Sequence, residues 1–90
     1  MEISLNQKVE DALRQAGVSF CLASVDCNLY EVAVPKSKVE AESDKITEAI
    51  RSLISQGVEA EERKINARAL ISTYIFSQRE EKVSVSVLLT

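Results

Sequence analysis

The 90-residue sequence contains no histidine and no tryptophan, and it has only two glycines and one proline. Without histidine there is no imidazole to act as a general base, to complete a Ser-His-Asp or Cys-His pair, or to ligate a metal. The two glycines, Gly17 and Gly57, each follow a predicted helix, so the sequence has no glycine-rich phosphate loop. We therefore expect no enzyme activity, no metal site and no cofactor. A cysteine nucleophile, Cys21 or Cys27, is the one catalytic option left open.

Cysteine is also scarce, with two residues separated by five positions. The first eleven residues, MEISLNQKVED, lack the basic and then apolar pattern of a signal peptide, so we expect a cytoplasmic protein with reduced thiols. Cys21 is predicted to be buried in a strand and Cys27 to lie in a turn. A disulfide would require a hairpin that places them opposite each other. No apolar stretch approaches the roughly 20 residues that cross a bilayer, so no membrane partner is expected.

Basic residues are fewer than acidic ones, 11 against 14, which gives a net charge of −3. This balance lowers the expectation of nucleic-acid binding, because each neutralised phosphate needs a lysine or arginine. The apolar content of 46% and the charged content of 28% are typical of a folded globular chain. At this length we expect residues 1–90 to form a single domain.

Capping signals and apolar periodicity predict two helices. Ser4 and Gln7 have the spacing of a capping box, in which Gln7 reaches back to the cap, and the following pattern predicts a helix over 4–16 that Gly17 ends. Ser37 and Glu40 repeat this spacing ahead of a predicted helix over 38–56, although Ser43 or Asp44 could start it later. The apolar stripes of the two helices contain Leu5, Val9, Ala12, Leu13 and Ala16, and then Val39, Ile46, Ala49, Ile50, Leu53 and Ile54.

Alternating apolar residues predict four strands. Residues 18–25 and 29–34 form a hairpin around the turn residues 26–28, and Pro35 ends the second strand. A second hairpin joins strands near 66–77 and 82–89. Residues 59–65 could be a loop, a helical turn or a strand extension, and a helix through 60–72 is the main competitor.

These elements predict an α+β fold in the order αββαββ, with a four-stranded, mainly antiparallel sheet and two helices packed on one face. The chain then divides into two αββ halves, about 1–35 and 36–90. The sequences LRQAGV at 13–18 and LISQGV at 53–58 echo each other weakly. The residues expected to face the helices are Phe20, Leu22, Tyr30, Val32, Val34, Val83, Val85, Val87 and Leu89.

The functional hypothesis concerns the second face of this sheet, the one opposite the two predicted helices. Cys21, Ala23, Ala33, Ser84, Ser86 and Leu88 are expected there, joined either by Ile71, Thr73 and Ile75 or by Leu70, Tyr74 and Phe76. Either set is too apolar for a face exposed only to water. We therefore predict a protein–protein interaction or regulatory domain, a homodimer formed through this face or through a hairpin edge. The alternative is a monomer in which Tyr74 or Phe76 curls over a sheet edge. The predicted interface residues are Leu70, Tyr74, Phe76, Ser84, Ser86 and Leu88.

A nucleic-acid-binding module is the second hypothesis. Arg63, Lys64 and Arg68 precede Tyr74 and Phe76, and basic residues beside exposed aromatics are how some proteins bind single strands. Glu59, Glu61 and Glu62 dilute this positive patch, and mixed charge runs usually form solvated surfaces. The sequence does not identify the partner under either hypothesis.

Overall fold

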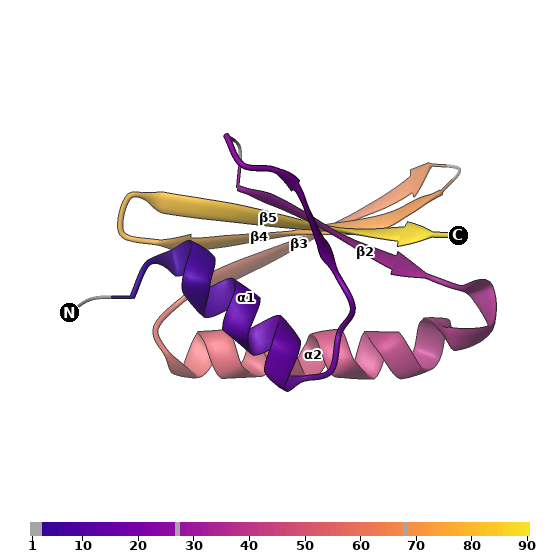
Figure 1. Cartoon of the computed structure of the whole chain (residues 1–90), viewed down its shortest axis with the longest axis horizontal. Coiled ribbons are helices and arrows are strands. Elements are labelled where there is room, and N and C mark those ends of the chain that lie inside the picture. The colour runs from indigo at the N-terminus through magenta and orange to yellow at the C-terminus, as the bar shows by residue number, and fades with distance from the viewer. Residues whose placement is uncertain (1–2, 27, 68) are drawn as a thin grey trace.

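Two α-helices lie side by side on one face of a five-stranded sheet in the computed structural model, which describes residues 3–26, 28–67 and 69–90 (Figure 1). They form one small, compact α+β domain. Neither helix combines the length and the apolar composition that crossing a bilayer requires, as far as the described residues go. The elements are α1 (Leu5–Gln15), β1 (Cys21–Ser24), β2 (Leu29–Val34), the 3-10 helix η1 (Lys36–Lys38), α2 (Val39–Ser55), β3 (Glu59–Ala67), β4 (Leu70–Gln78) and β5 (Glu81–Leu89).

The beginnings of the two helices differ from each other. At α1 the Gln7 backbone N–H donates to the Ser4 hydroxyl oxygen at 3.2 Å, so the predicted serine cap is confirmed. The Gln7 side chain does not reach back; it donates to Asp11 at 2.8 Å. The cap predicted at Ser37 is wrong, because Ser37 lies inside η1 and α2 begins after it with no side-chain cap.

The ends of both helices are confirmed. Gly17 and Gly57 have φ values of +81° and +83°, a left-handed conformation in which a side chain would be strained. The N–H of Val58, after Gly57, donates to the carbonyl of Leu53 at 3.1 Å, and Val18 makes the same bond at α1. This pattern is the Schellman motif, and it folds each buried valine back onto its helix.

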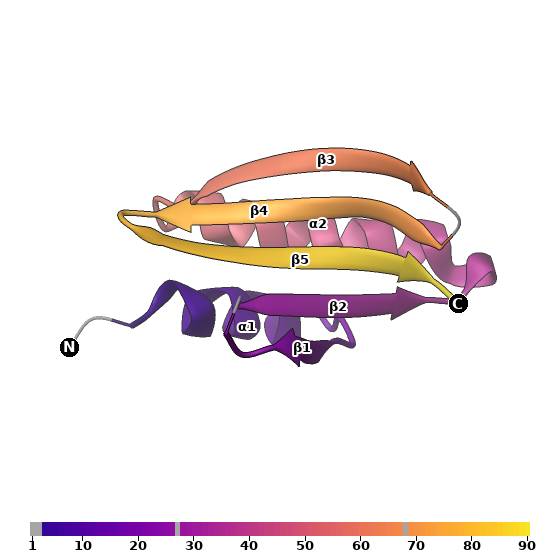
Figure 2. The same cartoon turned by 90° about the horizontal axis from the view of Figure 1, so that it is seen from above.

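The sheet has the order β1-β2-β5-β4-β3 (Figure 2). Strand β5 pairs with β4 in an antiparallel manner, as predicted, and it also pairs with β2 in a parallel manner. The last strand of the chain is therefore central and has no free edge. Val32 lies beside Val87 in this parallel pair, so the predicted inward valines of β2 and β5 meet under the helices.

The structure has five strands where the sequence predicts four. Residues 59–67 form β3, so the helix over 60–72 is not formed and the predicted strand over 66–77 covers the end of β3 and most of β4. The order is αββαβββ rather than the predicted αββαββ, because three strands instead of two follow α2. Strand β3 lies at the sheet edge with Glu59–Lys64 exposed, and a water-exposed charged strand lacks the apolar alternation by which strands are predicted.

The first strand is shorter than predicted and differently buried. Strand β1 covers only four residues, with an irregular register between Leu22 and Ser24. Cys21 is an exposed free thiol rather than a buried one, because β1 is an edge strand. Leu22 is 44% exposed, since the helices do not fully cover this edge. The turn position predicted for Cys27 lies outside the described residues.

The core lies between the helices and the sheet. Ile54, predicted in the apolar stripe of α2, is instead 56% exposed, since Ile46, Ala49 and Leu53 already form the buried side of that helix. The buried residues are Leu5, Val9, Ala12, Leu13, Val18, Tyr30, Val32, Val34, Ile46, Ala49, Leu53, Val58, Phe76, Val83, Val85 and Val87.

Candidate functional site

The surface of the sheet opposite the helices is left uncovered, and we call it the open face (Figure 1). The strand registers place its residues in rows. Leu29 of β2 lies beside Ser84 of β5, which lies beside Ile75 of β4. The face comprises Cys21 on β1, Leu29, Glu31 and Ala33 on β2, Lys82, Ser84, Ser86 and Leu88 on β5, Leu70, Thr73, Ile75 and Ser77 on β4, and Glu59, Glu61 and Arg63 on β3.

Four of the six predicted interface residues lie on the open face: Leu70, Ser84, Ser86 and Leu88. Tyr74 and Phe76 do not. Phe76 is 2% exposed beside the buried Val83, and Tyr74 lies beside the buried Val85 and packs against the core. Substitutions at these two positions would therefore disturb the core, and neither aromatic ring can contact a partner through the open face.

A β-bulge in β4 explains why neither predicted set of β4 residues is wholly correct. Leu70 lies opposite Leu88, but Ser72 lies opposite Val87, so Ile71 is an extra residue in the strand. Ile71 and Ser72 both line a small cavity of about 30 Å³ on the helix side of the sheet. Alternation resumes at Thr73, which points away from the helices together with Ile75.

The open face carries little charge on its central strands. Strand β4 has no charged residue at all, and its Thr73 hydroxyl lies 3.3 Å from the Ser86 hydroxyl of β5. Among the described residues of β2, β5 and β4, two charged side chains belong to this face, Glu31 and Lys82. Lys82 lies beside the β4–β5 turn, so Glu31 is the one near the centre. Leucine, isoleucine and alanine side chains surround the central hydroxyl groups. Thr73 and Ile75 belong to the β4 set that was not chosen for the predicted interface. Glu31 was missed altogether, although its position between the inward Tyr30 and Val32 already places it on this face.

The two sheet edges differ in character. Strand β3 carries five charged residues in its first six positions, which disfavours pairing with another strand. Strand β1 carries no charge, and Val25 just after it is 74% exposed. It is short and irregular, however, so it offers few backbone hydrogen bonds to a partner.

The two predicted basic residues that the structure describes, Arg63 and Lys64, lie on opposite sides of β3. Arg63 lies on the open face beside Thr73 and contacts its neighbour Glu61, with 3.3 Å between Nε and Oε1. Lys64 is the next residue of β3 and lies beside Ser72, on the helix side. Arg68 lies outside the described residues. Since Tyr74 and Phe76 also face the helices, the arrangement of exposed aromatics beside basic groups is not formed.

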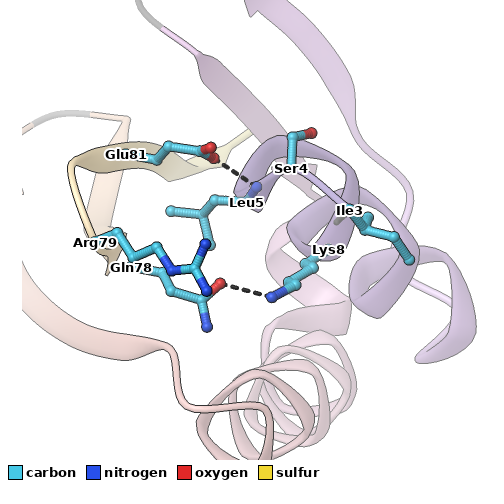
Figure 3. Close-up of a pocket in the computed structure, with 7 residues that line it drawn as sticks. All are labelled: Ile3, Ser4, Leu5, Lys8, Gln78, Arg79 and Glu81. Carbon is cyan, nitrogen blue, oxygen red and sulfur yellow. Dashed lines mark hydrogen bonds between the residues drawn. The ribbon is translucent and has the colours of Figure 1, made fainter. Parts of the chain in front are cut away.

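A pocket of about 270 Å³ lies where the β4–β5 turn meets the start of α1 (Figure 3). Its polar side chains bind one another. The Lys8 ammonium donates to the Gln78 side-chain oxygen at 2.7 Å, and the Leu5 backbone N–H donates to a Glu81 carboxylate oxygen at 2.6 Å. Its groups therefore hold the turn against the helix, and we assign it a structural role. Elsewhere in the described chain, no three cysteine, aspartate or glutamate side chains gather in a way that could hold a metal ion.

Two tyrosines have shifted acidities. Burial, and then the nearby Glu10 carboxylate, raise the pKa of Tyr30, and the positive charge of Arg14 lowers it to a smaller extent. The Tyr30 hydroxyl donates to the Asn6 side-chain oxygen and lies 3.3 Å from a Glu10 oxygen. Burial also raises the pKa of Tyr74, with Ser72 acting against it and Glu62 adding to it. Both hydroxyls lie on the helix side of the sheet, so these shifts bear on stability rather than on the open face.

Models of known protein families, curated proteins and solved structures were compared with this chain, and none of them matches it.

Proposed function

We propose that this chain is a protein–protein interaction domain that forms a homodimer by packing the open face against the same face of a second copy. The uncovered face itself carries the proposal. Both helices lie on the opposite side of the sheet, and the central strands present Leu29, Leu88 and Ile75 to solvent around a pair of hydroxyl groups. A sheet face that contacts only water usually carries polar and charged side chains, whereas β5 and β4 present mainly apolar and hydroxyl side chains at the centre of this face.

The dimensions of the open face indicate the strength of the dimer. Four strands about 4.8 Å apart, followed over five residues at about 3.3 Å each, give a face of roughly 20 Å by 17 Å. This is smaller than the roughly 800 Å² per partner of a standard interface. We therefore expect a reversible dimer with a dissociation constant on the order of 10 µM.

Pairing of two sheet edges is a less favoured way for two copies to form a dimer. Strand β5 is internal to the sheet, and the β3 edge is charged. The β1 edge remains as an alternative that the experiment must separate from the open face.

Sedimentation equilibrium between about 1 and 200 µM tests the proposal, with a reductant present so that the exposed Cys21 cannot crosslink chains. We expect the mass to rise from that of one chain to that of two. Ile75→Lys should keep the protein monomeric, because a lysine ammonium on the face would lose its water on association.

Two control variants make this experiment specific. Ile54→Lys places the same charge on the exposed side of α2, and Val25→Lys places it beside the β1 edge. Both should dimerise like the unsubstituted protein. A mass of one chain at 200 µM would refute the proposal, and a dimer lost only in Val25→Lys would move the interface to the β1 edge. Circular dichroism of each variant checks that it is folded.

A further inference from the structure

One row of residues crosses four of the five strands of the open face, and Cys21 of β1 lies beyond it, beside Glu31. The registers place Glu31 beside Ser86, Ser86 beside Thr73, and Thr73 beside Arg63, from β2 through β5 and β4 to β3. An acid thus stands at one end, a base at the other, and two hydroxyl groups 3.3 Å apart in the middle. Three strand spacings separate the two charges, about 14 Å, so they cannot pair within one chain.

Glu31 is the unusual member of this row. It is half-buried between the neighbouring strands, and no cation of the described residues forms an ion pair with it. Arg63 is exposed, and its ion-pair partner among the described residues is the exposed Glu61, two positions earlier in β3. Exposed ion pairs of this kind contribute little to stability, so Arg63 can bind a second carboxylate at a small cost in free energy. A half-buried carboxylate within a face of low charge favours a cationic partner.

We infer that the second copy docks with its twofold axis parallel to the strands, between β5 and β4, so that Glu31 of each chain pairs with Arg63 of the other. This inference rests on the proposed homodimer and adds its orientation. A rotation about that axis exchanges the two ends of the row. Glu31 then faces the partner subunit's Arg63, and Ser86 faces the partner subunit's Thr73. Leu88 and Leu70 lie beside each other in a parallel row, so the same rotation also places leucine against leucine.

The other face-to-face arrangement is disfavoured. An axis perpendicular to the strands that runs along this row places each strand over its own copy, so Glu31 would face Glu31 and Arg63 would face Arg63. Like charges brought together at an interface lower the affinity, so this geometry is disfavoured. Aligned sheets cross at about 30°, and the long arginine side chain can span the resulting offset at the ends of the row.

Charge exchange tests the orientation by sedimentation equilibrium. Glu31→Arg and Arg63→Glu should each weaken the dimer by about tenfold, and the double variant Glu31→Arg/Arg63→Glu should return to within about threefold of the unsubstituted protein. Glu31→Gln should weaken it a few-fold. Arg51→Glu is the matched control, because Arg51 contacts Glu48 at 3.2 Å with similar exposure but on the helix layer, and it should have no effect.

The outcomes separate the orientation from the dimer itself. If the protein dimerises and Ile75→Lys abolishes association, but the double variant is no stronger than the single variants, the orientation is wrong and the open-face dimer stands. A tighter dimer in Glu31→Gln would likewise overturn it, since that result belongs to Glu31 facing Glu31. A protein that stays monomeric would remove the proposed function and the orientation together.

Discussion

The backbone N–H of Leu5 donates a 2.6 Å hydrogen bond to a carboxylate oxygen of Glu81, a residue 76 positions later in the chain. The first turn of α1 thus has two caps, the local Ser4 hydroxyl and a carboxylate from the start of β5. A carboxylate at this position also interacts favourably with the positive end of the helix dipole. The contact joins the beginning of the fold to the β4–β5 hairpin (Figure 3).

Removing this long-range cap should destabilise the protein. We expect Glu81→Ala to lower the free energy of unfolding by about 1 kcal/mol, because it leaves the Leu5 N–H without its charged acceptor. Glu80→Ala is the matched control, since Glu80 is exposed in the adjacent turn and should change stability by less than about 0.5 kcal/mol. Urea denaturation followed by circular dichroism measures both. Equal effects of the two substitutions would show that the contact contributes nothing to stability.

Substitutions of two adjacent residues of β4 should differ strongly in their effect on stability. Phe76→Ala should cost about 3–5 kcal/mol of stability, because Phe76 is 2% exposed in the core. Ile75→Ala should cost much less, about 1 kcal/mol, because its side chain is only half-buried on the open face. Unfolding is measured at about 1 µM, below the expected dimerisation range. A larger loss at Ile75 than at Phe76 would contradict the assignment of the two faces.

Stability should fall in alkaline solution through Tyr30. Its pKa in the folded chain is raised above the ordinary value of 10.0, so the unfolded chain releases this proton first as the pH rises. The contribution of the protonated Tyr30 hydroxyl to the free energy of unfolding is therefore fully present below about pH 10, and it is lost as the pH rises through the raised pKa. Tyr30→Phe should be less stable by about 1 kcal/mol at pH 7, through the lost hydrogen bonds, and this difference should shrink above pH 10.

Urea denaturation of both proteins between pH 7 and pH 11.5 measures the effect of Tyr30. Tyr74 also has a raised pKa, but it is present in both proteins and cancels in the comparison. Parallel curves of stability against pH would mean that Tyr30 ionises equally readily in the folded and unfolded chains.

The open face was only partly predictable. Ser84, Ser86 and Leu88 lie on it because β5 alternates regularly, with the buried Val83, Val85 and Val87 between them. Strand β4 gave no such guidance, since it is apolar or aromatic on both sides and contains a bulge at Ile71. A one-residue irregularity reverses the side that every following residue faces, which is why Tyr74 and Phe76 were misplaced.

Local signals in the sequence determined the helix ends and the inward faces of β2 and β5. The serine before α1, the glycines after both helices and the alternating valines each act through their immediate neighbours, so they can be interpreted without a fold. Only the tertiary structure decided that β5 lies between β2 and β4, that β3 is a separate edge strand, and that Glu31 and Arg63 stand at opposite ends of one row. These relationships join residues far apart in the chain, and they form only when the two helices bury their apolar sides against one face of the assembled sheet.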